Sequence, residues 1–268
     1  MPLALVLARF AGTAALVAAV PSFALAQTVV SVAAERTELV VKLSDGRTLR
    51  SAELLGAELS IDDAGQAEVI RIDAVEKDTK SAALLHTVSV RTESGDFKPY
   101  CNPDADGRRV AFPIEGRSLA DGRLVADASR FELVCTSGAQ GKCVRLGYAP
   151  WLRLDAYNAC VRMIRADYCG DGVATTRDGT MIDVYDALGV QRSEPGAKLE
   201  FEAGWSPDGA VCVHHARIPE NTSLAKIAAR CPRLEHRAGA ACTEAAARAG
   251  GAIIFNRSHE SRPAEPTP

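Results

Sequence analysis

The chain has 268 residues, a formal net charge of −3, 24% charged residues and 5% aromatic residues. Acidic and basic residues are mixed along the sequence, so neither a basic surface nor a nucleic-acid partner is predicted. The length suffices for one large domain or two small ones with a hydrophobic core. The low aromatic content indicates that aliphatic packing and covalent crosslinks must supply much of the stability.

The first 26 residues have the features of a cleavable export signal. Arg9 supplies a positive charge, an alanine-rich apolar run follows, and Ala24 and Ala26 occupy the −3 and −1 positions of a signal-peptidase site. A retained N-terminal anchor is the alternative, but the apolar run is short for a membrane span and Pro21 interrupts it. We therefore predict cleavage after Ala26, a periplasmic or extracellular location, and no membrane span in the mature chain.

All the cysteines follow residue 100. They are Cys101, Cys135, Cys143, Cys160, Cys169, Cys212, Cys231 and Cys242. An even number of cysteines in an exported chain predicts up to four disulfides. A zinc site is the alternative, and Cys212 with His214 and His215 is its one mixed cluster, but the sequence holds no Cys-x-x-Cys pair. We therefore predict disulfides, with no metal and no cofactor.

Residues 27–100 are predicted to form an N-terminal β region without crosslinks of its own. Four segments alternate or cluster β-branched residues, a pattern typical of strands: residues 28–34, 37–43, 67–75 and 86–92. The segment 53–60 fits either a strand or a short helix. We interpret His86, in the fourth segment, as a strand residue rather than a metal ligand.

Residues 101–235 are predicted to form a cysteine-rich α+β domain. Strands are expected at 110–116 and within 120–135, and a tight loop between Cys135 and Cys143, because Ser-Gly and Gln-Gly steps favour turns. Further strands are expected within 175–190 and 198–218.

One central helix is predicted over residues 156–166, with Asp155 as its cap or in its first turn. One face is expected to carry Tyr157, Cys160, Val161 and Ile164. Arg162 and Arg165 should point toward the other side, and Gly170 and Gly172 should end the helix.

The remaining sequence completes the predicted organisation. Short helices are expected at 222–230 and 239–249, so residues 236–255 are predicted as a short helical C-terminal segment. The polar, proline-containing residues 256–268 are predicted to be a disordered tail. The predicted fold class is α+β, predominantly antiparallel β with one central helix, braced by disulfides.

Four ordered motifs resemble the ADYC domain family. They are CTSGAQGKCVRLGYAPW, YNACVRMIRADYCGDG, DGTMIDVYD and FEAGWSPDGAVCV, all between Cys135 and Arg217. The family takes its name from the tetrapeptide at Ala166–Cys169. The N-terminal strands and residues 110–116 resemble it more loosely. The resemblance implies an exported, disulfide-bearing bacterial domain, and it assigns no activity, ligand or catalytic residue.

Carboxylates near the tetrapeptide are the candidate catalytic groups. The acidic residues concerned are Asp167, Asp171, Asp178, Asp183 and Asp186. Two carboxyl groups roughly 5–10 Å apart could hydrolyse a glycoside. Turn and cap roles explain the same residues. Asp167, followed by Asp171, is the preferred candidate, because burying a carboxylate beside cysteines requires a specific partner.

Two other chemistries fit parts of the sequence. A Cys169 thiolate with His214 or His215 as base could act as a nucleophile, but an exported thiol among many cysteines is expected to be oxidised. The segment from Asn102 to Gly107, with Asp104 and Asp106, begins like a calcium loop, yet Pro113 stands where that loop needs a glutamate. An Asx-type turn explains the same residues.

Tyr148, Trp151 and Trp205 are the candidate ligand-binding residues, since aromatic rings can stack on a sugar, although packing under a loop is the more frequent explanation for such residues. Candidate partners are therefore a glycan or an envelope protein. The predicted function is a non-catalytic binding or structural module of the cell envelope. The alternative is a hydrolase that acts on an envelope polymer through Asp167 and Asp171.

The spacing of two cysteines constrains their partners. A helix that continues from Cys160 to Ala166 spans ~9 Å at ~1.5 Å per residue, whereas a disulfide joins Cα atoms no more than ~7 Å apart. Cys160 and Cys169 should therefore bond to other segments, for which those holding Cys135 and Cys143 are candidates. This predicts that the tetrapeptide is a crosslinked helix end rather than an active site.

Overall fold

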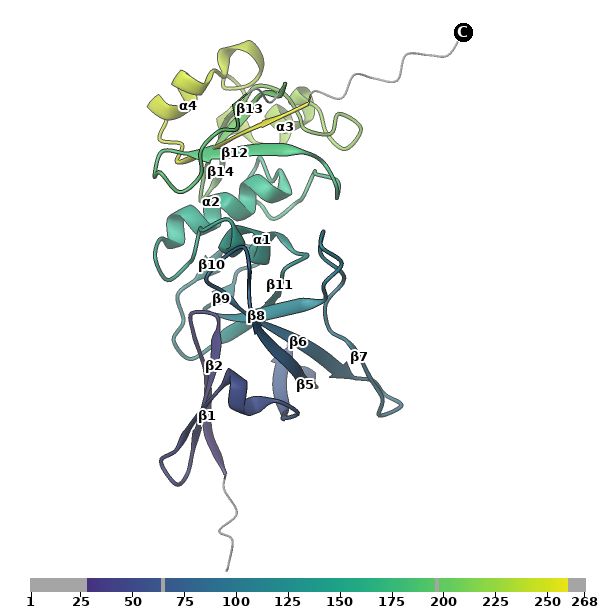
Figure 1. The fold of residues 1–268 in the computed structure, drawn as a ribbon. Coiled ribbons are helices and arrows are strands. Elements are labelled where there is room, and N and C mark those ends of the chain that lie inside the picture. The colour runs from purple at the N-terminus through teal and green to yellow at the C-terminus, as the bar shows by residue number, and fades with distance from the viewer. Residues whose placement is uncertain (1–27, 64–65, 196–197, 260–268) are drawn as a thin grey trace, which may run out of the picture.

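The computed structural model describes residues 28–63, 66–195 and 198–259. The predicted export signal and residues 260–268 of the predicted tail lie outside the described residues. Figure 1 shows the N-terminal strands in the lower half, helices α1 and α2 in the middle, and a second sheet with two more helices above them.

The N-terminal half contains two main antiparallel sheets. The smaller has the order β1 (Val29–Glu35), β2 (Glu38–Leu43), β3 (Thr48–Arg50). The larger runs β11 (Phe131–Cys135), β8 (Val110–Glu115), β6 (Leu84–Arg91), β5 (Gln66–Lys77), β4 (Glu58–Asp63), with β7 (Phe97–Pro99) also on β6. The four strands predicted within residues 27–100 are all present. Segment 53–60 contains both alternatives, since the 3₁₀ helix Ser51–Leu54 precedes β4.

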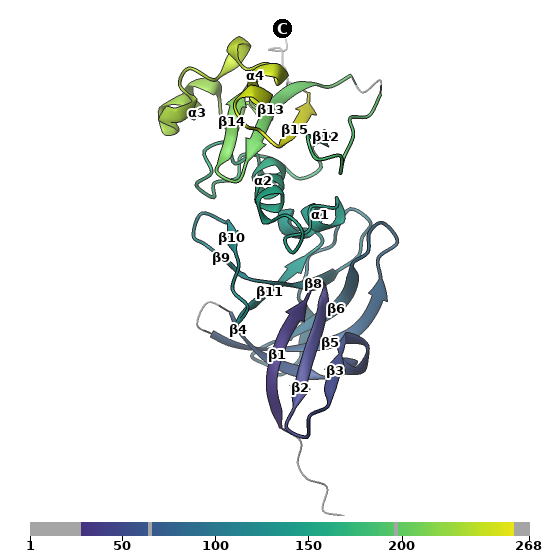
Figure 2. The same ribbon diagram turned by 90° about the vertical axis from the view of Figure 1, so that its left-hand side faces the viewer.

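The larger sheet is covered on both faces at strand β8. One face packs on the small sheet around Leu39, Val41, Ile70, Ile72 and Val88. Figure 2 shows the small sheet lying in front of the larger one. The other face packs on α1 and α2 through Phe112, Ile114 and Val134. Burial on both faces explains why β8 reads as a continuous apolar run rather than an alternating one.

Helix α1 (Ala139–Arg145) occupies the place where a tight loop was predicted between Cys135 and Cys143, so that prediction is wrong. Gly141 lies inside the helix, not in a turn. A Cβ atom at this position would sit 2.3 Å from the carbonyl oxygen of Cys135, so the glycine is needed for close packing of α1 against the end of β11.

The central helix α2 (Leu154–Arg165) is confirmed, with two corrections. The helix is buried on nearly all sides from Ala156 to Met163, because sheets cover it from below and above. Arg162, predicted to point outward, is therefore buried. The helix also ends earlier than predicted: Ala166 adopts the left-handed conformation at φ 49° and terminates it, before Gly170 and Gly172 are reached.

The C-terminal half is a four-stranded antiparallel sheet with short helices. The order is β12 (Ile182–Asp186), β15 (Ile254–Ser258), β13 (Glu200–Ser206), β14 (Gly209–Val213). The helices are α3 (Leu224–Arg230) and α4 (Glu244–Ala249), with 3₁₀ turns at Pro232–Leu234 and Gly239–Ala241. A two-stranded ribbon, β9 (Arg117–Ser118) with β10 (Leu124–Val125), precedes α1.

Strand β15 corrects the predicted disordered tail. Residues 256–258 belong to this strand, which pairs with β12 on one side and with β13 on the other. The prediction rests on the polar, proline-containing composition of the C-terminal segment, yet Asn256 and Ser258 are fully buried. Their buried partners, described below, account for the difference.

Four disulfides use all eight cysteines: Cys101–Cys135, Cys143–Cys160, Cys169–Cys231 and Cys212–Cys242. The prediction that Cys160 and Cys169 bond to other segments is confirmed. Cys143–Cys160 joins α1 to α2, and each such bond typically stabilises a fold by about 2–4 kcal/mol. The fold is α+β, mostly antiparallel β and disulfide-braced, as predicted. No helix within the described ranges is long and apolar enough to cross a membrane.

Candidate functional site

The candidate site begins where α2 ends. Ala166 turns the chain, and the side chain of Asp167 then accepts hydrogen bonds from three backbone amides. The donors are Gly170 N at 2.9 Å, Asp171 N at 3.2 Å and Gly172 N at 2.8 Å. A carboxyl group has two oxygens that can accept several such bonds at once, so Asp167 closes the turn that follows the helix.

Asp167 is also half of a buried ion pair. Its Oδ2 atom accepts a hydrogen bond from Arg162 at 2.6 Å, and both side chains are excluded from solvent. Arg162 donates further bonds to the carbonyls of Pro207, at 3.1 Å, and Asp121. The pair therefore joins the helix end to two loops that are distant in sequence. Buried pairs of this kind persist when further hydrogen bonds satisfy the charged groups.

Tyr168 points into the core. Its ring stacks on Trp205 with centroids 5.3 Å apart, its hydroxyl donates to Glu202 at 3.0 Å, and the hydroxyl oxygen accepts from Arg217 N at 2.9 Å. Burial, reinforced by the Glu202 carboxylate, raises the pKa of Tyr168 well above its usual value. The phenol is therefore held in its protonated form as a hydrogen-bond donor.

A second buried ion pair lies beneath Tyr168. Arg217 donates to both oxygens of Glu202, each at 2.9 Å. Burial alone would raise the pKa of Glu202, but the charge and hydrogen bonds of Arg217 outweigh burial and leave the pKa lowered. Asn256 connects this pair to the core: it donates to Glu202 at 2.6 Å and accepts from Trp205 Nε1 at 2.8 Å.

Arg217 also completes the end of α2. It donates to the carbonyl oxygens of Met163, at 2.8 Å, and Ile164, at 3.1 Å. The last carbonyls of a helix have no partner within the helix. Here the side chain of Arg217, which follows β14, supplies a hydrogen-bond donor to these carbonyls.

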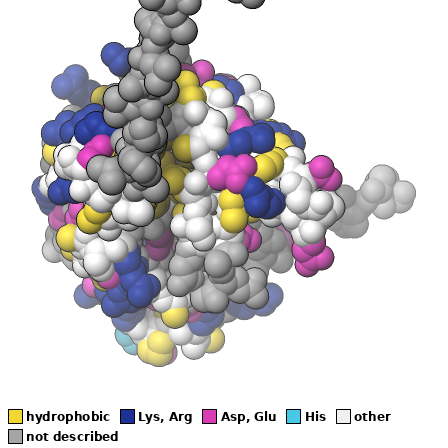
Figure 3. Space-filling model, turned by 90° about the horizontal axis from the view of Figure 1, so that it is seen from below, with side chains coloured by type: hydrophobic (Ala, Val, Ile, Leu, Met, Phe, Trp, Pro, Cys, Tyr) yellow, Lys and Arg dark blue, Asp and Glu magenta, His cyan; other side chains and the backbone are white. Residues whose placement is uncertain are grey.

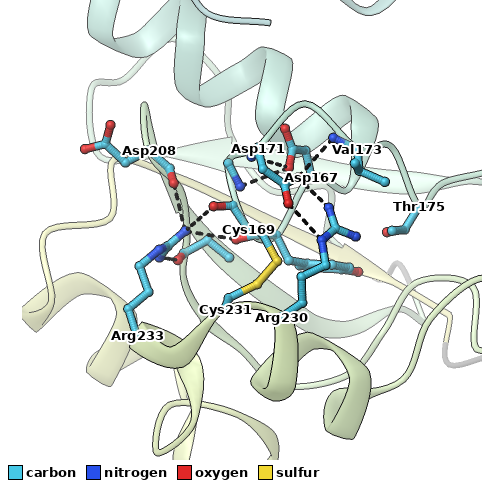
Figure 4. The surroundings of a disulfide bond; sticks show 12 residues. Asp167, Cys169, Asp171, Val173, Thr175, Asp208, Arg230, Cys231 and Arg233 are labelled. Carbon is cyan, nitrogen blue, oxygen red and sulfur yellow. Dashed lines mark hydrogen bonds and ion pairs between the residues drawn. A yellow bond between two sulfur atoms is a disulfide. The ribbon is translucent and has the colours of Figure 1, made fainter. Parts of the chain in front are cut away.

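The disulfide Cys169–Cys231 fastens the outer side of the turn to the segment after α3 (Figure 4). Beside it, Arg230 donates to Asp171 with its Nε atom at 2.8 Å. Hydrogen bonds from Arg230 are the main cause of the lowered pKa of Asp171. Arg233 lies on the other side of the disulfide and donates to the carbonyls of Tyr168 at 3.0 Å and Asp208 at 2.7 Å.

Gly170 is required by a close approach. Its φ is +72°, and a Cβ atom there would lie 2.0 Å from the carbonyl oxygen of Asp208. The turn after the tetrapeptide therefore presses against the β13–β14 turn, and a larger residue would separate the two.

This arrangement bears directly on the two candidate catalytic acids. Asp167 is fully buried and paired with Arg162, so a substrate cannot reach it. Asp171 is partly exposed, but its lowered pKa keeps it ionised and paired with Arg230. A glycoside hydrolase needs one accessible protonated acid beside one accessible carboxylate. The geometry of these two acids does not supply that combination.

The three candidate aromatic residues do not form one surface. Trp205 is buried under Tyr168, and Tyr148 is buried with its hydroxyl donating to Asp186 at 2.7 Å. Trp151 is 38% exposed in the loop before α2, next to the more exposed Leu152. A sugar-stacking role would therefore rest on Trp151 alone.

The calcium-like loop is filled by protein cations. Asp104 lies 3.5 Å from both Arg108 and Arg145, and Asp106 contacts Lys80 at 2.7 Å. The two carboxylates are therefore paired with cationic side chains of the protein itself. Within the described ranges, no group of three or more His, Cys, Asp or Glu side chains could hold a metal ion.

The candidate thiol site is likewise used structurally. Cys169 is in a disulfide, and so is Cys212 of the candidate zinc cluster. His214 contacts the carbonyl of Cys242, while His215 contacts Ser258 at 3.0 Å. Neither histidine is placed to activate Cys169.

One serine–histidine contact was missed by sequence reasoning. Ser51 Oγ and His86 Nε2 are 2.8 Å apart, which is the geometry of a nucleophile and its base. Both residues are fully buried, and Ser51 also accepts a hydrogen bond from Leu39 N. Burial lowers the pKa of His86, so the ring is neutral. The contact joins the two sheets of the N-terminal half, and no substrate can approach it.

The large opening of the molecule lies elsewhere, in the N-terminal half. A groove of about 1150 Å³ runs between β1, β4 and β11 and is lined by Val29, Val32, Glu58, Leu59, Ser60, Ile61, Tyr100, Gly116, Arg117, Ser118, Ser129, Arg130, Phe131, Glu132 and Leu133. Small-molecule pockets usually measure ~300–1,000 Å³. The sequence does not predict this groove, because five segments far apart in the chain form its lining.

Charge and apolar groups are mixed on the lower end of the molecule. Figure 3 shows hydrophobic side chains there, interspersed with basic and acidic side chains.

A second, smaller cavity of about 250 Å³ lies beside Cys169 and is lined in part by Thr175, Lys226 and Arg230.

Comparison with known protein families identifies the chain. A model of the ADYC domain matches residues 51–219, well over half of the sequence. The chain belongs to the ADYC domain family. Comparisons with curated proteins and with solved structures found no match. In this ADYC protein the matched range contains β4 to β8, both central helices and β12 to β14, whereas Cys231 and Cys242, which complete two disulfides, lie beyond it.

Proposed function

We propose that this ADYC protein is an exported, non-catalytic binding module of the cell envelope. The four disulfides indicate an oxidising location outside the cytoplasm. The sequence of residues 1–26, with the motif Ala24-Leu25-Ala26, supports export with cleavage after Ala26. Bacterial origin follows from the family resemblance and belongs to the same proposal.

The pairing of the candidate acids with arginines is the observation that supports a non-catalytic function. The acidic groups of the named tetrapeptide and its turn are committed to internal pairs, Asp167 with Arg162 and Asp171 with Arg230. By contrast, the groove of the N-terminal half presents apolar side chains and strand edges to solvent. Such a surface can bind a partner without reacting with it.

Export is tested by mass measurement. The full-length chain should be expressed in a bacterium and the purified product analysed intact without reducing agent. We expect a species that begins at Gln27 and lacks the two hydrogens lost in each of four disulfides. A chain that keeps residues 1–26, or one with free thiols at Cys160 and Cys169, would contradict the proposal.

Binding and hydrolysis are separated by a sedimentation assay with isolated envelope polymer. We expect the protein to sediment with the polymer and to release no soluble fragments. Release of fragments that disappears in Asp171→Asn would instead establish the alternative, a hydrolase. An absence of both sedimentation and release would contradict both functions.

A further inference from the structure

The groove of the N-terminal half is bordered by three strand edges. In the six-stranded sheet β11 and β4 are the two ends of the strand order, with β7 attached separately to β6, and β1 is an outer strand of the three-stranded sheet. All three strands contribute to the groove lining. Figure 2 shows β1, β4 and β11 on the same side of this half. The groove therefore lies where edge strands of the two packed sheets come close to one another.

Backbone groups of β4 face this groove. In an antiparallel pair, residues alternate between those bonded to the neighbouring strand and those directed away from it. Ala57 is bonded to Ile72 of β5, so Leu59 and Ile61 continue the bonded series in this register. The N–H and C=O groups of Glu58 and Ser60 are therefore directed outward.

Backbone groups of β11 are arranged in the same way. Thr136 N donates to Val110 O and Gly116 N donates to Arg130 O, so the even-numbered residues bond to β8. The N–H and C=O groups of Phe131 and Leu133 are directed outward. An exposed row of such groups is a template for another strand.

The directions of the strands also suit an added strand. Each neighbouring pair in the order β11-β8-β6-β5-β4 is antiparallel. The two edges, β4 and β11, therefore run in the same direction. A single extended segment could be antiparallel to either edge, which is the more stable arrangement.

The groove offers an apolar floor and a basic rim. Leu59, Ile61, Phe131 and Leu133 pack on the core between the sheets from the groove side. At the rim, the side chains of Arg117 and Arg130 are 49% and 70% exposed, and their Nε atoms lie 3.7 and 3.9 Å from the same oxygen of Asp127. These distances exceed those of a hydrogen bond. The two arginines carry two positive charges against the single negative charge of Asp127. The remaining positive charge complements an acidic group on a partner.

We propose that this groove binds an extended polypeptide segment of a partner protein, which adds as a strand to β4 or β11. The segment would alternate apolar residues, facing the floor, with polar ones, and would place an acidic group at Arg117 and Arg130. Main-chain hydrogen bonds supply affinity in strand addition, and the alternate side chains supply specificity. This inference rests on the proposed binding function and names the class of its partner.

The test uses a phage-displayed library of random dodecapeptides, selected on the intact, disulfide-bonded protein. Enriched peptides are synthesised with and without methyl groups on alternate backbone nitrogens and titrated by fluorescence anisotropy. We expect enriched sequences to alternate apolar and polar residues and to contain an acid. Backbone methylation should weaken binding at least about tenfold, since it removes hydrogen bonds.

Two variants locate the binding site. Ser60→Pro removes an outward-facing N–H on an edge strand, where proline is tolerated, and should weaken binding about tenfold. Arg117→Glu combined with Arg130→Glu should do the same while leaving the backbone donors in place. Lys98→Glu with Arg192→Glu is the matched control, because both are exposed, carry the same charge change and lie outside the groove lining. Circular dichroism checks that each variant is folded.

The outcomes decide the proposal. Failure to enrich any peptide, equal binding of methylated and unmethylated peptides, or full binding by both groove variants overturns strand addition. If the protein nevertheless sediments with envelope polymer, the broader binding function stands with a different ligand, such as a glycan. If sedimentation also fails, the proposed function fails as well.

Discussion

The two halves of the molecule are stabilised in different ways. The C-terminal half and its junction with α2 hold two buried ion pairs, Glu202–Arg217 and Asp167–Arg162, and two disulfides. The N-terminal half relies on sheet packing and one disulfide, Cys101–Cys135, and it carries the large groove. The region richest in reactive residue types is thus the most closed, while the plainer β region presents the accessible surface.

The tetrapeptide belongs to the closed region of the molecule. Each of its four residues has a structural role, since Ala166 ends the helix, Asp167 closes the turn, Tyr168 fills the core and Cys169 is crosslinked. A cluster of polar and reactive residues therefore need not be an active site. Here it fixes a helix end against a sheet.

The largest expected effect comes from breaking the buried pair of the C-terminal half. Arg217→Met leaves Glu202 buried without its charge partner and should lower the free energy of unfolding by about 3–5 kcal/mol. Urea titration followed by the fluorescence of the buried Trp205 measures it. The double variant with Glu202→Gln should recover part of the loss. A single variant as stable as the wild type would refute the role assigned to this pair.

Removal of the Cys169–Cys231 disulfide should have the next largest effect. Replacing both cysteines by alanine should lower the free energy of unfolding by about 3 kcal/mol, because the unfolded chain gains conformational freedom. Peptide binding in the groove should be unchanged, since neither cysteine lines it. Loss of groove binding in a folded double variant would show that the disulfide of the C-terminal half affects the groove of the N-terminal half, so that the two halves are coupled.

Low pH should lower the free energy of unfolding by weakening the ion pair between Asp78 and Arg145, at the junction between the halves. Arg145 of α1 donates to Asp78 at 2.9 Å, and although burial opposes it, the pKa of Asp78 falls from 3.8 to about 2. The stabilisation is thus complete above about pH 4 and is lost as pH falls toward 2. We expect Asp78→Asn to be less stable than wild type by about 1–2 kcal/mol at pH 6, with the difference shrinking near pH 2. Urea titrations at both pH values measure this, and a constant difference would contradict it.

The smallest effect is expected at the exposed pair beside the disulfide. Asp171→Asn should change the free energy of unfolding by less than about 1 kcal/mol, because Asp171 and Arg230 are both partly exposed. The buried Asp167→Asn is its matched comparison and should cost clearly more. Thermal unfolding of the two variants tests the order, and equal costs would show that burial does not distinguish these acids.

The parts of the fold that follow from local pattern could be predicted from sequence. Alternating β-branched residues indicated the strands of the N-terminal half, and helix length excluded a Cys160–Cys169 bond. Parts set by tertiary contacts could not. Gly141 favours a turn locally but is helical because α1 packs on Cys135, and Asn256 looks solvent-exposed but bonds Glu202 and Trp205. Arg162 is buried because two loops and Asp167 surround it.

The candidate site divides in the same way. The structural role of the tetrapeptide followed from cysteine geometry and the cost of burying Asp167. The groove could not be predicted, because Leu59 and Phe131 become neighbours of one cavity only when the sheets pack. Edge positions of β4 and β11 depend on the strand order, which the sequence does not display locally.

Binding is assigned to the groove and not to the turn that follows the tetrapeptide. Fluorescence anisotropy with one selected peptide compares the affinities of Ser60→Pro and Asp171→Asn. We predict that Ser60→Pro weakens binding about tenfold and that Asp171→Asn leaves it unchanged. Loss of binding in Asp171→Asn, with wild-type affinity in a folded Ser60→Pro variant, would place the binding site at the turn and not in the groove.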